Sequence, residues 1–192
     1  TYDELRLATA YLYMKPWFGF HSTRLFAMGD ARGNNIYGDN NNETGYAPYC
    51  LFTDKPNTPG LADAWNSLYI VVTQADYIIN DYAPQGRQHF SEAQANACEG
   101  EARFMRAAAY YYLASYWHDV PIMENPIAHT EAFNMAPTRF EDVIRYGIRD
   151  LEYAAEWLPL ADADGRVTRY SALGLLARYY VCLLYTSPSP RD

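Results

Sequence analysis

The sequence predicts an all-α fold in which helical hairpins are interrupted by one long irregular segment. Apolar residues recur at spacings of three and four through most of the chain, which is the pattern of amphipathic helices. The alternation of apolar and polar residues that marks half-buried strands is nearly absent. Residues 29–60 differ from the rest, since they collect glycine, asparagine, aspartate and proline and show no periodicity.

The first helix is predicted over residues 2–14. Thr1 and Glu4 form a capping box, in which each side chain satisfies a backbone N–H at the start of the helix. Pro16 ends the helix, because proline has no N–H to donate and its ring clashes with the preceding turn.

The irregular segment, residues 29–60, contains several aromatic residues among its polar ones. Irregular segments of this length are uncommon inside a compact domain and are often functional. We therefore expect a ligand site in this part of the chain.

Two helices are predicted next. The spacing of apolar residues gives a helix that begins at Leu61 and stops before Pro84. The following helix begins behind a capping box of Ser91 and Gln94 and ends before Pro121.

The last two helices complete a pattern of antiparallel pairs. One is predicted behind a capping box of Thr138 and Glu141 and closes at Pro159, and the other begins near Thr168. Helix pairs with short connections indicate a tetratricopeptide-like superhelix. Because a repeat in such an array cannot bury its face alone, we expect the last helix to expose apolar side chains.

Composition excludes several classes of function. The net charge is −8 and there are only two lysines, which argues against nucleic acid, because phosphate binding needs clustered cations. No Gly-rich phosphate loop or Gly-x-Ser-x-Gly elbow occurs in the sequence. Nucleotide binding and the hydrolases whose nucleophilic serine lies in such an elbow therefore have no support from the sequence. The four histidines have no metal-ligand spacing, and the sequence predicts no metal, cofactor or catalytic residue.

Two clusters resemble active sites but have simpler explanations. Glu101, Arg103 and Arg106 fall on one predicted helix, where ion pairs that brace neighbouring helices are the favoured interpretation. Ser115, His118 and Asp119 are too close in sequence for a catalytic triad, whose members converge from separate elements. We expect the Asp119 carboxylate to accept backbone N–H groups at the turn.

The aromatic residues of the irregular segment suit a sugar ligand. The chain has 19 tyrosines against 8 phenylalanines and 4 tryptophans, so most of its rings carry a hydroxyl. A sugar ring stacks its C–H face on aromatic rings and pairs its hydroxyls with amides, carboxylates and guanidinium groups. The alternative is that these tyrosines fasten the segment to the helices. The candidate ligand-binding residues are Asp30, Arg32, Asn34, Tyr37, Tyr46 and Tyr49.

One run of the sequence resembles a known family. Residues 100–104 read Gly-Glu-Ala-Arg-Phe, and residues 118–121, at the end of the same predicted helix, read His-Asp-Val-Pro. This run resembles the signature of the SusD/RagB family, and the segments 65–80, 149–159 and 165–177 resemble further parts of that family in the same order. The departures are His118, where the family usually has glycine, Asp76, where it usually has asparagine, and Ser171, where it tends to have alanine.

The resemblance implies a SusD-like fold and a non-enzymatic function. Members bind oligosaccharides at the cell surface and deliver them to a SusC-like TonB-dependent transporter. It implies anchoring to the outer membrane through a lipidated N-terminal cysteine, which is not in this sequence. Two alternatives stay open from the residues: a helical scaffold that binds proteins without glycan, and a glycosidase, which would need two converging carboxylates.

The end of the chain differs in character from the rest. Residues 182–192 match the translation of a common transposase adaptor, and we expect them to be a non-native tail. On this interpretation residues 1–181 form part of a SusD-like helical domain.

Overall fold

The computed structural model describes residues 2–14, 17, 19–33, 35, 46–125 and 135–186. The chain divides into two compact units, one formed by Tyr13–Ile70 and the other by Thr1–Leu12 together with Val71–Asp192. Each unit is considered by itself below. No strand occurs among the described residues, where the only ladder pairing is one isolated antiparallel bridge between Val120 and Thr138, so the all-α prediction is confirmed.

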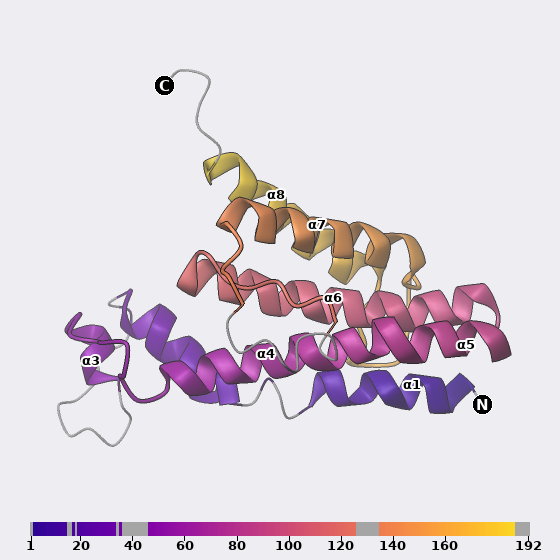
Figure 1. Cartoon of the computed structure of the whole chain (residues 1–192), viewed down its shortest axis with the longest axis horizontal. Helices are drawn as coiled ribbons and strands as arrows, with labels where there is room; N and C mark the ends of the chain where they lie inside the picture. Colours follow the sequence, from indigo (N-terminus) through magenta and orange to yellow (C-terminus); the bar gives the residue numbers. More distant parts are fainter. Residues whose placement is uncertain are drawn as a thin grey trace. The chain divides into compact units, whose positions relative to one another are not determined.

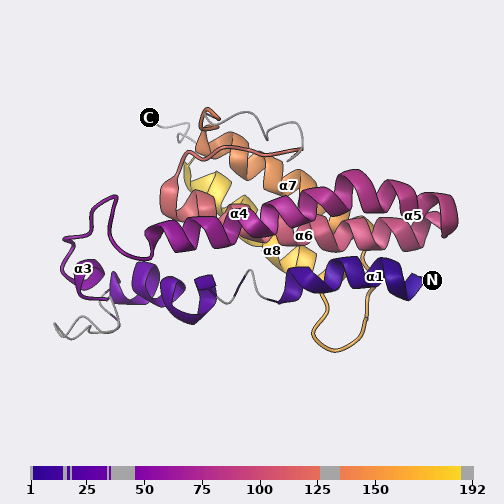
Figure 2. The same cartoon turned by 60° about the horizontal axis from the view of Figure 1, so that its bottom comes forward.

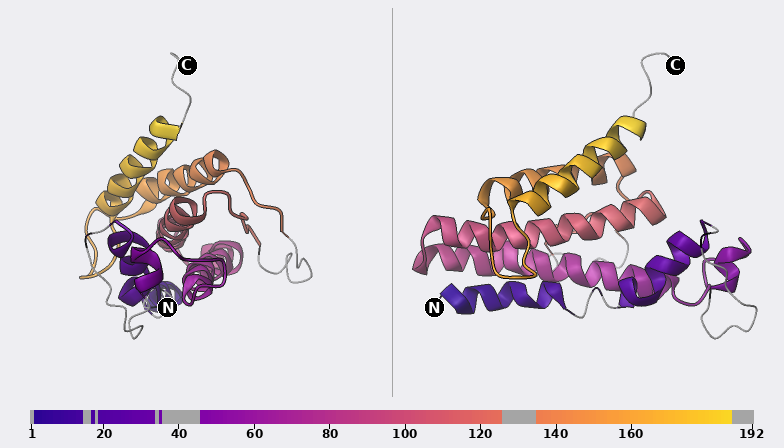
Figure 3. Two further views of the ribbon diagram at one scale, coloured as in Figure 1. Left: turned by 90° about the vertical axis from the view of Figure 1, so that its left-hand side faces the viewer. Right: turned by 180° about the vertical axis from the view of Figure 1, so that it is seen from behind.

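The larger unit is an array of helical hairpins (Figure 1). Its long helices run back and forth, with α6 packed against α7 and α7 packed against α8 (Figures 1 and 3). The helix α1, at the amino terminus of the chain, lies along α6 (Figure 2). This arrangement is the predicted tetratricopeptide-like superhelix. The helices are α1 (Tyr2–Ala10), α5 (Ala83–His89), α6 (Glu92–Trp117), α7 (Phe140–Trp157) and α8 (Arg169–Thr186), together with the end of α4 (Leu61–Tyr77).

Two predicted helix starts are confirmed. The Ser91 hydroxyl accepts the Gln94 N–H, and the Gln94 side chain accepts the Ser91 N–H, so the capping box opens α6 as expected. At the start of α8, the Thr168 N–H donates to the Ser171 hydroxyl, 3.2 Å away. The first predicted helix is also present, as α1 followed by the 3₁₀ turn η1 (Tyr11–Tyr13), although Thr1 lies outside the described residues.

The predicted stop before Pro84 is wrong. After α4 the backbone continues through the π-helical turn η4 (Ile78–Tyr82) directly into α5, and Pro84 lies in the first turn of α5. Pro84 has no N–H to donate, and it lies where the hydrogen-bond pattern changes from π-helical to α-helical. The π-helical turn accommodates the interruption of the hydrogen-bond ladder that a proline causes.

The predicted capping box of Thr138 and Glu141 is also wrong. Thr138 exchanges both backbone hydrogen bonds with Val120, at 3.0 and 3.2 Å, and is therefore held in extended pairing. The cap comes from a distant residue, because the Asp119 Oδ1 atom accepts the Phe140 N–H at 2.8 Å. Asp119 thus accepts a backbone N–H as predicted, but it does so at the start of α7.

A buried tyrosine fixes the position of α8. The Tyr179 hydroxyl donates to the Ala107 carbonyl at 2.6 Å, and its ring is fully buried. The ring lies against Gly147 of α7, where any side chain would collide with it. Three helices are therefore held in register by one side chain and the glycine that admits it.

The smaller unit contains the π-helical turns η2 (Phe20–Arg24) and η3 (Phe26–Ala31), the short helix α3 (Ala47–Cys50) and the beginning of α4. Its buried side chains include Phe20, Met28 and Tyr49. The irregular segment predicted at residues 29–60 is confirmed over residues 51–60. Residues 47–50 form one helical turn instead, and η3 extends into the segment as far as Ala31.

Candidate functional site

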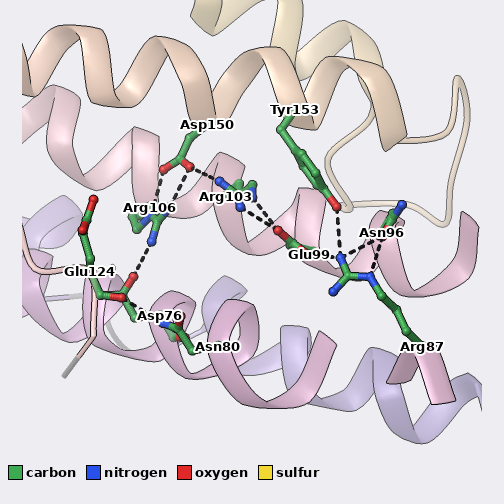
Figure 4. Close-up of polar contacts among 10 residues, drawn as sticks. All are labelled: Asp76, Asn80, Arg87, Asn96, Glu99, Arg103, Arg106, Glu124, Asp150 and Tyr153. Atoms are coloured by element: carbon green, nitrogen blue, oxygen red, sulfur yellow. Dashed lines mark hydrogen bonds and ion pairs between the residues drawn. The ribbon is translucent and has the colours of Figure 1, made fainter. Parts of the chain in front are cut away.

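The charged cluster of α6 belongs to a ladder of ion pairs that is buried at Asp76, Arg106 and Asp150 and partly exposed at its arginines Arg103 and Arg87 (Figure 4). The Arg106 guanidinium donates to both carboxylate oxygens of Asp150 on α7, at 2.7 and 2.8 Å, and to Asp76 on α4 at 2.5 Å. Arg103 donates to Asp150 at 2.9 Å and to Glu99 at 2.7 Å.

The ladder continues to α5. There the Arg87 guanidinium donates to Glu99, to the Asn96 side-chain oxygen at 2.8 Å and to the Tyr153 hydroxyl at 3.3 Å (Figure 4). Acid and base alternate along the whole series, from Asp76 at one end to Arg87 at the other. Because these six charges are matched with one another inside the helical array, the ladder is scaffold, and the predicted bracing by Arg103 and Arg106 is confirmed.

Asp76 is the weakest point of the ladder. Its Oδ1 atom meets Arg106, but its Oδ2 atom is buried without a hydrogen-bond partner among the described residues. Burial raises the pKa of Asp76 to about 7, although the charge of Arg106 acts in the opposite direction. Burial acts to lower the pKa of Arg106, but this pKa is raised because the charge and hydrogen bonds of Asp150, with the charges of Tyr146 and Asp76, together outweigh burial.

Glu101 belongs to a second, smaller group of ion pairs. Its carboxylate accepts from Arg166 at 2.7 Å and from Arg6 at 3.4 Å, and Arg6 also donates to Asp162 at 2.6 Å. This group joins α1 and the segment before α8 to the middle of α6. It too is a structural brace.

The structure shows no catalytic triad at Ser115, His118 and Asp119. The Ser115 hydroxyl donates to the Tyr111 carbonyl of its own helix at 2.6 Å. The His118 ring contacts Asp119 at 2.8 Å, and the pKa of Asp119 is lowered by the Phe140 N–H and then by His118. His118 has φ 66° and ψ −95°, so it keeps a backbone conformation that favours glycine.

The irregular segment holds the sequence-predicted ligand residues. Asp30 lies in η3, and Arg32 directly follows the end of η3. Tyr46 precedes α3 and is half-buried. Tyr49 is fully buried, and its hydroxyl lies 3.5 Å from the Pro59 carbonyl oxygen, so its ring offers no face to a ligand in this conformation. It instead fastens the segment, which is the alternative considered for these tyrosines. Asn34 and Tyr37 lie outside the described residues.

Two residues from outside the candidate set accompany Arg32. The Arg32 guanidinium donates to Asp54 at 2.8 Å, and its central carbon lies 5.4 Å from the centroid of the Phe52 ring. Phe52 is 66% exposed. We refer to Phe52, Arg32 and Asp54 as the Phe52 platform. The aromatic composition of the irregular segment includes Phe52, but composition alone does not show that its ring is exposed.

A surface pocket of about 360 Å³ lies elsewhere, between α6 and α8. Its walls include Phe104, Tyr111, Tyr112, Tyr170 and Arg178. The pocket adjoins an exposed apolar face of α8 that includes Tyr170, Leu173 and Val181, which confirms the predicted exposure of the last helix. In arrays of helical hairpins such a face is normally covered by a further helix, so this pocket is weaker as a ligand site than the irregular segment. Among the described residues there is no group of three metal-ligating side chains.

Comparison with known proteins identifies the family. Residues 20–181 match the SusD-like family described as starch-binding and associating with the outer membrane. A SusD-like protein of Bacteroides ovatus is 34% identical over 182 residues, which are 94% of this chain and 33% of that protein.

Solved structures agree with this match. A structure solved with xylogluco-oligosaccharide is 33% identical in sequence to this chain and has a TM-score of 0.81. The match covers 92% of this chain and 34% of the chain in that structure. A laminarin-binding SusD-like protein has a TM-score of 0.78 over 93% of this chain and 40% of its own, and its 20% identity shows likeness of fold alone.

The chain spans about a third of the length of the Bacteroides ovatus relative and of the structure with xylogluco-oligosaccharide. The family match extends over most of the chain, through both the irregular segment and the helical array. The chain therefore belongs to the SusD-like family.

Proposed function

We propose that the protein containing this chain captures an oligosaccharide at the cell surface and delivers it uncleaved to a TonB-dependent outer-membrane transporter. The observation that carries the proposal is the exposed pairing of an aromatic ring with a guanidinium and a carboxylate at the Phe52 platform, in a chain of the SusD-like family. Aromatic faces and charged hydrogen-bonding groups are the two components that sugar recognition requires.

The proposed ligand residues divide by their placement. Asp30, Arg32 and Tyr46 are proposed as contacts because none of them is buried. Tyr49 is proposed as the anchor that holds the segment in place, since its ring is enclosed. Asn34 and Tyr37 remain predictions from the sequence.

The proposed location is the outer face of the outer membrane, with attachment through an N-terminal lipid. The proposed partner is a SusC-like transporter. The helices within the described residues are too short or too polar to span a bilayer. Co-purification of the full-length protein with a transporter encoded beside it would test the partnership, and recovery of the protein without any such transporter would contradict it.

Glycan binding is tested by calorimetric titration of the chain with neutral oligosaccharides, including xylogluco- and laminari-oligosaccharides. The variant Arg32→Ala removes a proposed contact, and we expect roughly tenfold weaker binding, the effect of losing one or two hydrogen bonds to a charged group. The matched control is Arg139→Ala, because Arg139 is an exposed arginine that contacts Glu141 in the larger unit. Equal losses in both variants, or release of shortened sugars, would contradict the proposal.

The second candidate is a helical scaffold that binds another protein without glycan. The array of helical hairpins favours it, since such arrays create extended surfaces that bind other proteins. Transporter association that persists in a protein with no measurable glycan affinity would support this alternative.

A further inference from the structure

A second surface pocket, of about 640 Å³, lies between α7 and α8 in the larger unit. This volume is within the range of pockets that hold small molecules. Leu183 lines it but belongs to residues 182–192, which we expect to be a non-native tail. The remaining walls, which define the site, are Ile122, Asp142, Arg145, Ile148, Arg149 and Tyr180.

Two arginines stand in one wall of this pocket. Arg145 and Arg149 are both exposed, and their spacing of four residues puts them on the same face of α7. Neither forms an ion pair within the part of the chain that the structure describes, although Asp142 and Glu152 lie within one turn of them. Glu152 instead accepts from the Tyr180 hydroxyl at 2.9 Å. Because like charges at this spacing repel, an anion bound between the two arginines would relieve the repulsion.

A buried ring supports Arg149. The central carbon of its guanidinium lies 5.7 Å from the centroid of the Tyr146 ring, and Tyr146 is only 7% exposed. The same ring lies 4.8 Å from the central carbon of Arg106, which belongs to the ion-pair ladder. Arg149 therefore rests on a fixed surface, and a side chain that is already positioned loses less freedom when it binds a ligand.

The other walls limit the kind of anion. Asp142 adds one carboxylate, so with the two arginines the pocket carries one net positive charge, which matches a monoanion better than a dianion. A carboxylate also suits the planar fork of arginine, which can donate two parallel hydrogen bonds to it. Ile122 and Ile148 supply apolar surface beside these charges.

We propose that this pocket binds a monocarboxylate with a small apolar body, the carboxylate meeting Arg145 and Arg149 and the body covering Ile122 and Ile148. The inference goes beyond the proposed function, because its ligand is not an oligosaccharide. The site also shares no residue with the irregular segment.

The test is a titration of the chain, followed by nuclear magnetic resonance, with benzoate and with benzamide, which has a similar shape but no charge. Benzoate should bind at least about tenfold more tightly. Arg145→Ala and Arg149→Ala should each weaken benzoate binding roughly tenfold and leave benzamide unaffected. Both arginines are exposed, so the variants should unfold at the same temperature as the unaltered chain. Arg139→Ala is the matched control, because Arg139 precedes the same helix and pairs with Glu141 outside the pocket.

Phenyl phosphate distinguishes a carboxylate site from a phosphate site. At pH 8 it is a dianion, so it should bind more weakly than benzoate, and Asp142→Asn should narrow that difference. Equal affinities for benzoate and benzamide, equal losses in Arg139→Ala and Arg149→Ala, or tighter binding of phenyl phosphate would each overturn the inference. Benzoate binding by this chain that is absent from the full-length protein would also overturn it, since the arginines would then be occupied by the rest of the polypeptide.

Discussion

Replacing Asp76 by asparagine tests the account of the ion-pair ladder. The substitution keeps an oxygen that can accept from Arg106, removes a buried negative charge, and places an amide where the carboxylate oxygen has no partner among the described residues. Arg106 keeps both of its hydrogen bonds to Asp150. The buried cation therefore stays paired in the variant.

The expected magnitude follows from the pKa of Asp76. Burial raises this pKa to about 7 from the ordinary 3.8, so the folded chain holds the proton more tightly than the unfolded chain. The stability contributed by protonated Asp76 is fully present below pH 3.8 and is lost as the pH rises to about 7. At about 1.4 kcal/mol for each pH unit between the two values, the loss amounts to about 4 kcal/mol.

The measurement is urea unfolding followed by far-UV circular dichroism at pH 5, 6, 7 and 8. The unfolding free energy of Asp76→Asn minus that of the unaltered chain should rise with pH and level off near pH 8. Titrations that the two proteins share cancel in this difference. Asp164→Asn, at an exposed loop position, makes the same chemical change outside the helical core and serves as the control. A difference that stays constant across the range, or that falls with pH, would refute the reasoning.

Two further substitutions test the packing and the backbone. Gly147→Ala should lower the unfolding free energy by about 1–3 kcal/mol, because the new methyl group collides with the Tyr179 ring. Gly174→Ala should raise the unfolding free energy by about 0.5–1 kcal/mol, because Gly174 lies in a helix with open space around it. Equal effects of these two changes in thermal or urea unfolding would contradict the role given to Tyr179. His118→Gly should raise the unfolding free energy by about 1 kcal/mol, since it relieves a positive φ, and lower stability would show that the contacts of His118 with Asp119 and Phe140 outweigh the strain.

The sequence determined which parts of the chain are helical and how several helices begin. The spacing of apolar residues located the long helices, because one face of each must be buried along the whole length. The capping box of Ser91 and Gln94 was readable because both partners lie within one turn. Local patterns of this kind need no knowledge of the remaining chain. They also carried the family resemblance, since its motifs are continuous segments.

The tertiary structure decided what depends on partners distant in sequence. The cap of α7 comes from Asp119, 21 residues before the N–H it accepts, and no local pattern distinguishes it from the capping box expected at Thr138. The ladder likewise joins Asp76, Arg106 and Asp150 from three helices.

The candidate site shows the same limit most clearly. Composition identified the irregular segment as the place to look, because rings and polar groups gather there. It could not tell an enclosed ring from a displayed one. Tyr49 is buried and Phe52 is exposed, since the fold of the turn, and not the type of either residue, determines which side of the segment each ring faces.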